Sequence, residues 1–338
     1  MARLLMTNRL LRRSRNLKQR RLRFRRENTM ADKIATRQAY GEALVELGKE
    51  FDNLVVMDAD LSGSTKTSMF AKEFPDRFFN MGIAEQNMYG AATGLALSGK
   101  IVCASTFAMF ATGRAFEIVR NSIGYTHANV KVCASHAGIT VGEDGASHQT
   151  FEDIALMRTI PGMTVVNPSD AVATKKLLRQ IVEMDGPCYF RIGRAAVPVF
   201  YGEDDDITLG KGNLIRDGKD VTIIATGIMV SAAYEAAEKL AEEGVDARVI
   251  DIHTIKPIDE EIILKAAEET GAIVTAEEHG VIGGLGDAVA QVVVKKHPCR
   301  MAMIGQQDTF GESGKPDQLL AKYHMTADDI AEAAKKLL

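Results

Sequence analysis

Residues 81–94 read Met-Gly-Ile-Ala-Glu-Gln-Asn-Met-Tyr-Gly-Ala-Ala-Thr-Gly, and Glu85 is the only charged residue among them. The mixture of small and apolar residues predicts the buried start of a helix. A lone ionised carboxylate in apolar surroundings is costly unless another group hydrogen-bonds to it or protonates it. Glu85 therefore either accepts hydrogen bonds from the backbone of its own helix or faces a partner from elsewhere.

Strand-like and helical segments alternate on both sides of this stretch. Short apolar runs bounded by glycine and polar residues predict strands at 54–57, 101–105, 130–134, 164–167 and 188–192. Amphipathic spacing predicts helices at 36–50, 84–98, 111–123 and 170–184. Because strands that alternate with helices form parallel sheets, we expect a mainly parallel sheet covered by helices on both faces.

The alternation is interrupted at residues 195–220, where Pro198 and the acidic run at 203–206 predict a linker or surface excursion. A second α/β unit follows, in which Asp259 is expected to cap a helix. Its strands are expected at 221–225, 248–252 and 272–276. The predicted fold class is therefore α/β, with two successive domains at 30–200 and 201–338.

The composition is that of a globular chain: 338 residues, 46% of them hydrophobic and 25% charged, are enough for two domains. No apolar run approaches the ~20 residues that span a bilayer, which argues against a membrane protein. The four cysteines lie far apart without a Cys-x-x-Cys pair. We therefore expect buried free thiols in a reducing compartment, the cytoplasm, and neither disulfides nor a zinc site.

Positive charge is concentrated at the N-terminus. Residues 1–29 contain ten Arg, one Lys and one acidic residue, a net charge of +10, while the whole chain carries −4. The remaining residues are therefore acidic, which argues against nucleic-acid binding. The Arg-rich segment has the features of a transit peptide, of a basic arm for an acidic partner, or of sequence upstream of a start at Met30. In each case we expect it to be disordered and outside the fold.

Side chains able to do chemistry follow several of the predicted strands. Since the carboxyl ends of parallel strands share one edge of a sheet, these side chains should converge there. Besides Glu85 they comprise two acids, two aromatic rings and two histidines: Asp60, Asp144, Phe107, Phe110, His136 and His148. Together they predict a catalytic edge. By contrast, the glycines at 283–286 lack the spacing of a phosphate-binding loop and favour close packing, and His279 beside two carboxylates favours a structural role.

Three of these motifs resemble the pyrimidine-binding domain of transketolases. They are Gly-Ile-Ala-Glu-Gln-Asn at 82–87, Thr-Phe at 106–107 and Gly-Glu-Asp-Gly-Ala-Ser-His-Gln at 142–149. The third motif is highly specific, whereas the Glu motif is shared more widely among thiamine-diphosphate enzymes. The similarity continues through Pro-Ser-Asp-Ala at 168–171 and a C-terminal α/β domain, so that it covers essentially residues 32–338.

The resemblance implies thiamine diphosphate as the cofactor. Glu85 would be catalytic, hydrogen-bonded to N1′ of the aminopyrimidine and favouring the tautomer that removes a proton from the thiazolium ring. Such a bond in a water-poor pocket is charge-assisted and strong. Phe107 and Phe110 would wall the ring, with plain core packing as the alternative for both. Asp60 would lie near the thiazolium side.

The resemblance also implies the sugar-binding residues. His148 would bond the terminal hydroxyl of the donor sugar and Asp144 an α-hydroxyl, with His148 and His136 both counted as catalytic. The distal phosphate would be held by Arg37, Ser64, His136 and Arg191. A guanidinium suits a phosphate because it can donate two parallel hydrogen bonds. We choose Arg191 over the nearby Arg194 for that role.

One departure from the family concerns the charged end of the cofactor. Full-length transketolases carry an N-terminal domain whose Gly-Asp-Gly motif holds Mg²⁺ and the diphosphate, and this sequence contains no Gly-Asp-Gly. We therefore expect no metal site in this chain and a separate N-terminal subunit that binds Mg²⁺ and the diphosphate. The two subunits would form a heterotetramer that transfers a two-carbon ketol unit between sugar phosphates, as in the pentose phosphate pathway.

Two alternatives remain open. Ala84 and Gln86 beside Glu85 also resemble deoxyxylulose-phosphate synthase, and paired subunits also suit the β chain of a 2-oxoacid dehydrogenase. Both would use an oxoacid such as pyruvate as the donor, whereas the two histidines favour a hydroxylated donor. The other alternative is a non-catalytic partner subunit, although a scaffold has no chemical need for Glu85, Asp144 and both histidines.

Overall fold

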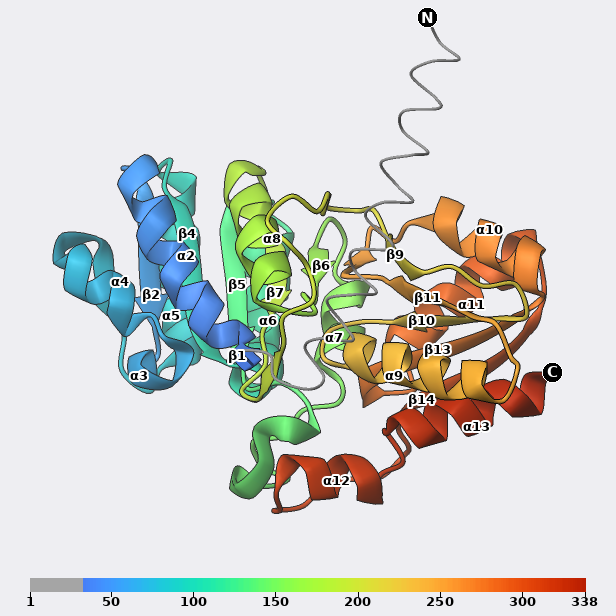
Figure 1. The fold of residues 1–338 in the computed structure, drawn as a ribbon. Coiled ribbons are helices and arrows are strands. Elements are labelled where there is room, and N and C mark those ends of the chain that lie inside the picture. The colour runs from blue at the N-terminus through green and yellow to red at the C-terminus, as the bar shows by residue number, and fades with distance from the viewer. Residues whose placement is uncertain (1–32) are drawn as a thin grey trace, which may run out of the picture.

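The computed structural model describes residues 33–338. The Arg-rich residues 1–29 and Met30 lie outside the described residues. The three interpretations of that segment therefore stay predictions. Within the described part, the helices and strands form two successive α/β units (Figure 1). This confirms the fold class predicted from the sequence.

The first unit is built on a seven-stranded sheet. Its strands lie in the order β12 (Thr254–Lys256), β6 (Thr164–Val166), β7 (Cys188–Arg191), β5 (Val130–Ser135), β4 (Ile101–Phe107), β2 (Leu54–Asp58) and β3 (Phe78–Asn80). All neighbouring pairs are parallel except β12 with β6, which is antiparallel. The carboxyl ends of six strands therefore face the same edge.

Helices cover both faces of this sheet, because successive residues of a strand point to opposite faces. Leu54 and Val56 pack in one buried cluster with helices α2 (Thr36–Glu50) and α8 (Ala171–Glu183). Val55 and Met57 pack in the other cluster with α5 (Glu85–Leu97). Figure 1 shows α2 and α8 in front of the strands. Shorter elements connect the strands: α3 (Ser62–Thr65), α4 (Ser68–Glu73), η1 (Pro75–Arg77), η4 (Ile139–Asp144) and α7 (Asp153–Thr159).

The second unit has a five-stranded sheet in the order β14 (Arg300–Gln306), β13 (Ala272–Gly280), β10 (Val221–Ala225), β11 (Ala247–Asp251) and β9 (Asn213–Arg216). Only β9 is antiparallel to its neighbour. Two pairs of helices cover opposite faces: α9 (Met229–Glu242) with α13 (Ala327–Leu337), and α10 (Glu260–Thr270) with α11 (Leu285–Lys296). Helix α12 (Pro316–Lys322) leaves this unit and packs beside η4 of the first (Figure 1).

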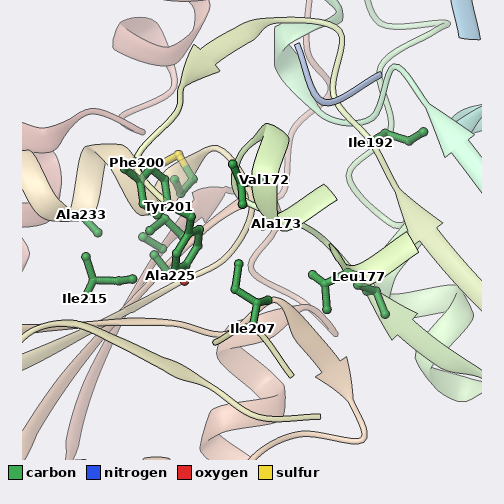
Figure 2. Packing of buried hydrophobic residues seen from close by; sticks show 14 of the residues in the cluster. Val172, Ala173, Leu177, Ile192, Phe200, Tyr201, Ile207, Ile215, Ala225 and Ala233 are labelled. Atoms are coloured by element: carbon green, nitrogen blue, oxygen red, sulfur yellow. The ribbon is translucent and has the colours of Figure 1, made fainter. Parts of the chain in front are cut away.

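The two units share a buried core. Strand β12 follows the second unit's β11 in the chain but pairs with β6 of the first sheet. Phe200, Tyr201 and Ile207 of the connecting segment are buried, and Figure 2 shows Phe200 and Tyr201 side by side in the cluster that also contains Val172 and Ala225. The expectation of a surface excursion is therefore wrong for this part of the connection, because its side chains fill the junction. The domain division between residues 200 and 201 stays a prediction.

The structure also has a short two-stranded sheet, and it differs from the sequence prediction at residues 111–123 and at Asp259. Strands β1 (Lys33–Ala35) and β8 (Ala196–Pro198) pair with each other. Where the pattern predicts a regular helix at 111–123, the chain forms two π-helical segments, η2 (Phe110–Arg114) and η3 (Val119–Gly124), on either side of the short α6 (Phe116–Ile118). Such turns insert a residue that a 3.6-residue period does not reveal. Asp259 precedes α10 but makes no capping bond, because its carboxylate accepts the N–H of Gly212 at 3.0 Å.

Several smaller expectations can be compared directly. All four cysteines are free, and Cys103, Cys133 and Cys188 are buried as predicted. The glycine cluster is closely packed, since a Cβ on Gly284 would lie 2.0 Å from Oε2 of Glu277. No helix within residues 33–338 is long and apolar enough to cross a bilayer.

Asp170 joins α8 to the connecting segment and should be a large single contributor to stability. Its Oδ1 accepts the N–H of Ala173 at 2.8 Å, and its Oδ2 accepts the N–H groups of Phe200 and Tyr201 at 2.9 and 2.8 Å. Asp170→Ala leaves three buried donors unpaired, and we expect a loss of about 3 kcal/mol in the free energy of unfolding. The exposed Asp204→Ala in the same segment is the control, with an expected change within about 0.5 kcal/mol. Equal urea midpoints for the two variants would contradict this account.

Candidate active site

The candidate site lies at the carboxyl edge of the first sheet. Strands β2, β4 and β5 are neighbours and end at Asp58, Phe107 and Ser135. In the registers of these strands, Asp58 lies opposite Ser105, and Phe107 lies opposite Ser135. The loops that carry the predicted residues therefore begin side by side, where open α/β sheets place their ligands.

His136 occupies the centre of this edge. It is 3% exposed with a positive φ of 57°, and its ring stacks on Phe107 at a centroid distance of 3.9 Å. Its Nε2 lies 3.4 Å from Nη1 of Arg37 and its Nδ1 lies 2.8 Å from Oγ of Ser135. Because a guanidinium can only donate, we assign Nε2 as the acceptor and Nδ1 as the protonated nitrogen.

The surroundings of His136 keep its imidazole neutral. Burial lowers the pKa of His136 to about 3, and the positive charges of Arg37 and Arg194 act in the same direction. Burial and Arg194 also lower the pKa of Arg37. At neutral pH the edge therefore holds a neutral imidazole between cationic side chains.

Aromatic rings form a wall next to His136. Phe107 and Phe110 stack at 6.1 Å, and the ring of His148 meets the edge of Phe110 at 5.5 Å and that of Phe107 at 6.3 Å. Nδ1 of His148 lies 2.9 Å from Oγ of Ser147. Asp144, at the end of η4, is exposed. The structure thus brings both predicted phenylalanines and both predicted histidines together.

Arg37 reaches this edge from the first turn of α2. Its Nη1 also donates to the backbone oxygen of Ser64 at 2.9 Å. Ser64 lies in α3, after Asp58, whose buried carboxylate accepts the N–H of Leu61 and the hydroxyls of Thr65 and Thr67. The fixed loop after β2 therefore places Ser64 beside Arg37.

Glu85 is the first residue of α5 and is 3% exposed. Its Oε2 is buried with no hydrogen-bond partner among residues 33–338, and the same holds for the hydroxyl of Tyr89 one turn later. Burial raises the pKa of Tyr89, and the charges of Cys133 and Glu85 act in the same direction. A buried unpaired carboxylate oxygen fits a ligand that donates a hydrogen bond, as an aminopyrimidine does.

Asp60 is tied to the segment that precedes Glu85. It is exposed with a positive φ of 65°. Nδ2 of Asn80 donates to Oδ1 of Asp60 at 3.1 Å, while Oδ1 of Asn80 accepts the N–H groups of Asp60 and Gly82 at 3.1 and 3.0 Å. Asn80 therefore connects the loops after β2 and β3, a role that the sequence analysis missed.

Arg191 does not join this group, so the choice of Arg191 for the substrate phosphate does not fit the structure. Arg191 is the last residue of β7 and is 3% exposed. Its Nε and Nη2 donate to the carboxylate of Asp153 at 2.7 and 3.3 Å, and Nη2 also donates to the backbone oxygen of Glu278 at 2.8 Å. Burial by itself lowers the pKa of Arg191, but the pairing with Asp153 outweighs it and raises the pKa, and Nε and Nη2 are engaged within the protein.

Arg194, by contrast, lies at the edge with the other predicted residues. Its Nη1 donates to the backbone oxygen of Val141 and to Oε2 of Glu143, the latter at 3.0 Å. It lies three residues beyond the strand end, in the loop at the edge that carries the other site residues. The expectation that site residues follow the carboxyl ends of the strands could therefore have selected Arg194, since Arg191 still belongs to the buried strand.

Among residues 33–338, no cluster of three or more His, Cys, Asp or Glu side chains could hold a metal ion. The edge brings together one carboxylate oxygen without a partner among these residues, aromatic rings, two imidazoles and two guanidinium groups. Fold and site together define an α/β protein with a candidate ligand site at the carboxyl ends of parallel strands.

The chain belongs to the transketolase family. Residues 32–199 match the family model of the transketolase pyrimidine binding domain, and residues 210–330 match that of the transketolase C-terminal domain.

Known proteins resemble almost the whole described chain. It is 54% identical over 299 residues to a putative transketolase C-terminal section of Methanocaldococcus jannaschii, covering 88% of this chain and 94% of that protein. It is 39% identical over 313 residues to human transketolase, covering 91% of this chain but 50% of the human one. A solved structure described as a split gene transketolase, inactive beta4 tetramer, superimposes with a TM-score of 0.85 at 55% identity, covering 90% of this chain and 98% of that one.

The different surroundings of Arg191 and Arg194 predict different effects on stability. Arg191→Met leaves the buried carboxylate of Asp153 without its charge partner, and we expect a loss of about 3–5 kcal/mol in the free energy of unfolding. Arg194→Met removes a partly exposed side chain, for which we expect a change below about 1 kcal/mol. Urea unfolding followed by circular dichroism measures both values. A similar loss in the two variants would show that the two arginines are not separated as described.

Proposed function

We propose that this chain is the C-terminal subunit of a thiamine-diphosphate-dependent transketolase. The enzyme would transfer a two-carbon ketol unit from a ketose phosphate to an aldose phosphate, together with a separate diphosphate-binding subunit. The observation that carries the proposal is the buried Oε2 of Glu85, which has no hydrogen-bond partner among residues 33–338. Its helix α5 packs against β4, the strand that ends at Phe107 of the stacked aromatic pair. An exposed acid could satisfy itself with water, whereas this one needs a ligand.

The chain's own residues would hold the pyrimidine end of the cofactor. Bound thiamine diphosphate supplies the electron sink for breaking and forming a carbon–carbon bond next to a carbonyl. Glu85 would hydrogen-bond to N1′ of the aminopyrimidine and accept the N1′–H of its imino tautomer, so favouring that tautomer and controlling the protons of the ring. Phe107 and Phe110 would wall the ring and exclude water, and Asp60 would lie on the thiazolium side.

The same edge suits a phosphorylated sugar. Arg37 and Arg194 would bind the distal phosphate, helped by Ser64 and by the neutral His136. His148 and Asp144 would bond hydroxyl groups of the donor. Because the ring of His136 stays uncharged, the positive charge that meets the phosphate would come from the guanidinium groups of Arg37 and Arg194.

The comparisons support a two-subunit enzyme. The relative from Methanocaldococcus jannaschii is described as a C-terminal section, and the human relative matches this chain over about half of its own length. The tetramer of a single split-gene chain is described as inactive. We propose that the partner subunit holds Mg²⁺ and the diphosphate, that the two subunits assemble as a cytoplasmic heterotetramer, and that the reaction belongs to the pentose phosphate pathway.

Glu85→Gln tests the proposed role of the carboxylate. The amide keeps the size of the side chain but loses the charge that strengthens a hydrogen bond to N1′, so kcat of the reconstituted two-subunit complex should fall at least ~100-fold. Assembly, measured by analytical ultracentrifugation, should not change. The exposed Glu73→Gln in α4 is the matched control and should keep full turnover. Unchanged turnover in Glu85→Gln would favour a non-catalytic partner subunit.

The donor sugar separates this proposal from the oxoacid enzymes. With an aldose phosphate as acceptor, the reconstituted complex should turn over xylulose phosphate and not pyruvate, because the histidines at the edge suit a hydroxylated donor. Coupled assays of both donors under the same conditions decide between them. Turnover with pyruvate alone would overturn the assignment and favour a deoxyxylulose-phosphate synthase-like or 2-oxoacid dehydrogenase-like subunit.

A further inference from the structure

The loop that carries the proposed sugar-binding residues has little regular structure of its own. It runs from His136 to His148, and three of its glycines have positive φ: Gly138 at 77°, Gly142 at 80° and Gly145 at 76°. Its only regular element, η4, is kinked at Gly142. Such a backbone keeps one conformation only when neighbouring groups fix it.

One of these groups is a carboxylate from the second unit. Glu278 lies in β13 and is 3% exposed, and the backbone N–H of Thr140 donates to its Oε1 at 2.6 Å. A Cβ added to Gly138 would lie 2.4 Å from Cδ of Glu278. The carboxylate therefore fills the space that the missing side chain leaves, directly against the loop.

The second unit contacts the loop at further points. Gln149, next to the loop, donates from Nε2 to the backbone oxygen of Glu312 at 3.0 Å. A Cβ on Gly145 would lie 2.4 Å from Oγ of Ser313. Helix α12 lies beside η4 (Figure 1). The loop thus rests on the second unit, and the Glu278 contact is its anchor nearest to His136.

We propose that Glu278 is a positioning residue of the first unit's active site: its carboxylate fixes the backbone at Thr140 and thereby the places of His136, Asp144 and His148. This inference rests on the proposed function, because these three residues are its sugar ligands. Glu278 itself touches neither the cofactor nor the sugar in this account. The role of the second unit would then be to hold the sugar-binding loop in its working conformation.

Two substitutions of Glu278 distinguish the effect of the position of its side-chain oxygen from the effect of its charge. Glu278→Asp keeps the charge but withdraws the oxygen by one methylene from the N–H of Thr140. Glu278→Gln keeps an oxygen at the original reach but removes the charge. If Glu278 acts by position, Asp is the damaging variant and Gln is the tolerated one; if it only balances the charge of the buried Arg191, the order is reversed.

The preceding residue provides a matched control. Glu277 is fully buried in the same strand, and its carboxylate accepts the N–H groups of Leu285 and Gly286 at 2.6 and 2.8 Å. These donors belong to the start of α11 and not to the sugar-binding loop. Glu277→Asp and Glu277→Gln therefore disturb a similar buried carboxylate without touching Thr140.

The experiment compares all four variants in the reconstituted complex with xylulose phosphate as the donor. We expect Glu278→Asp to lower kcat/KM by about 10–100-fold and Glu278→Gln to stay within about 3-fold of the wild type. In hydrogen exchange followed by mass spectrometry, the peptide that spans 138–145 should exchange faster in Glu278→Asp only. Both Glu277 variants should keep wild-type exchange in that peptide.

The outcomes distinguish the two proposals. Activity lost in Glu278→Gln and kept in Glu278→Asp would overturn the positioning role, as would unchanged exchange at 138–145 in Glu278→Asp. If Glu278→Asp did not fold, wild-type exchange would decide: a Thr140 amide that exchanges as fast as the exposed end of the loop would refute the anchor. A wild-type complex that did not use xylulose phosphate would refute the proposed function, while the exchange comparison would still test the contact.

Discussion

A buried carboxylate oxygen, Oε2 of Glu85, has no partner in the part of the chain that the structure describes, and this is the constraint on which the rest of the site depends. Leaving such an oxygen unpaired costs at least about 1–3 kcal/mol, a cost that a bound hydrogen-bond donor removes. The apolar packing of α5 against the first sheet holds the carboxylate at the carboxyl edge. Asn80 accepts hydrogen bonds from the N–H groups of Asp60 and Gly82 and so connects the loops after β2 and β3. The side chains of the site are therefore held in place before any ligand binds, and a ligand would supply the hydrogen bond that Glu85 lacks.

The two units of the chain have unequal roles at this edge. The first supplies the side chains that face the ligand, and the second supports the loop that carries several of them through Glu278 and the backbone of Glu312. The buried pair of Arg191 and Asp153 lies at the same junction, where Arg191 also donates to the backbone of β13. This charged pair therefore joins the two units through their buried backbone and side chains.

The sequence could predict the elements whose signals are local. Strands such as 101–105 and helices such as 36–50 follow from periodicity, and the strand-end rule brought Phe107 and His136 to one edge. What it could not predict depends on distant contacts. The pairing of β12 with the first sheet, and the carboxylate of Glu278 on Thr140, join residues far apart in the chain. The prediction chose Arg191 over Arg194, although residue type does not distinguish the two. Their positions differ: Arg191 still belongs to the buried strand β7, whereas Arg194 lies in the loop that follows it.

Thiamine-diphosphate binding tests the central claim most directly, that this chain supplies half of a cofactor site. Isothermal titration of the cofactor with Mg²⁺ into this chain, into the diphosphate-binding subunit, and into their complex gives three binding curves. The account predicts tight binding, at one cofactor for each copy of this chain, only in the complex. Tight binding and turnover by this chain alone would contradict it.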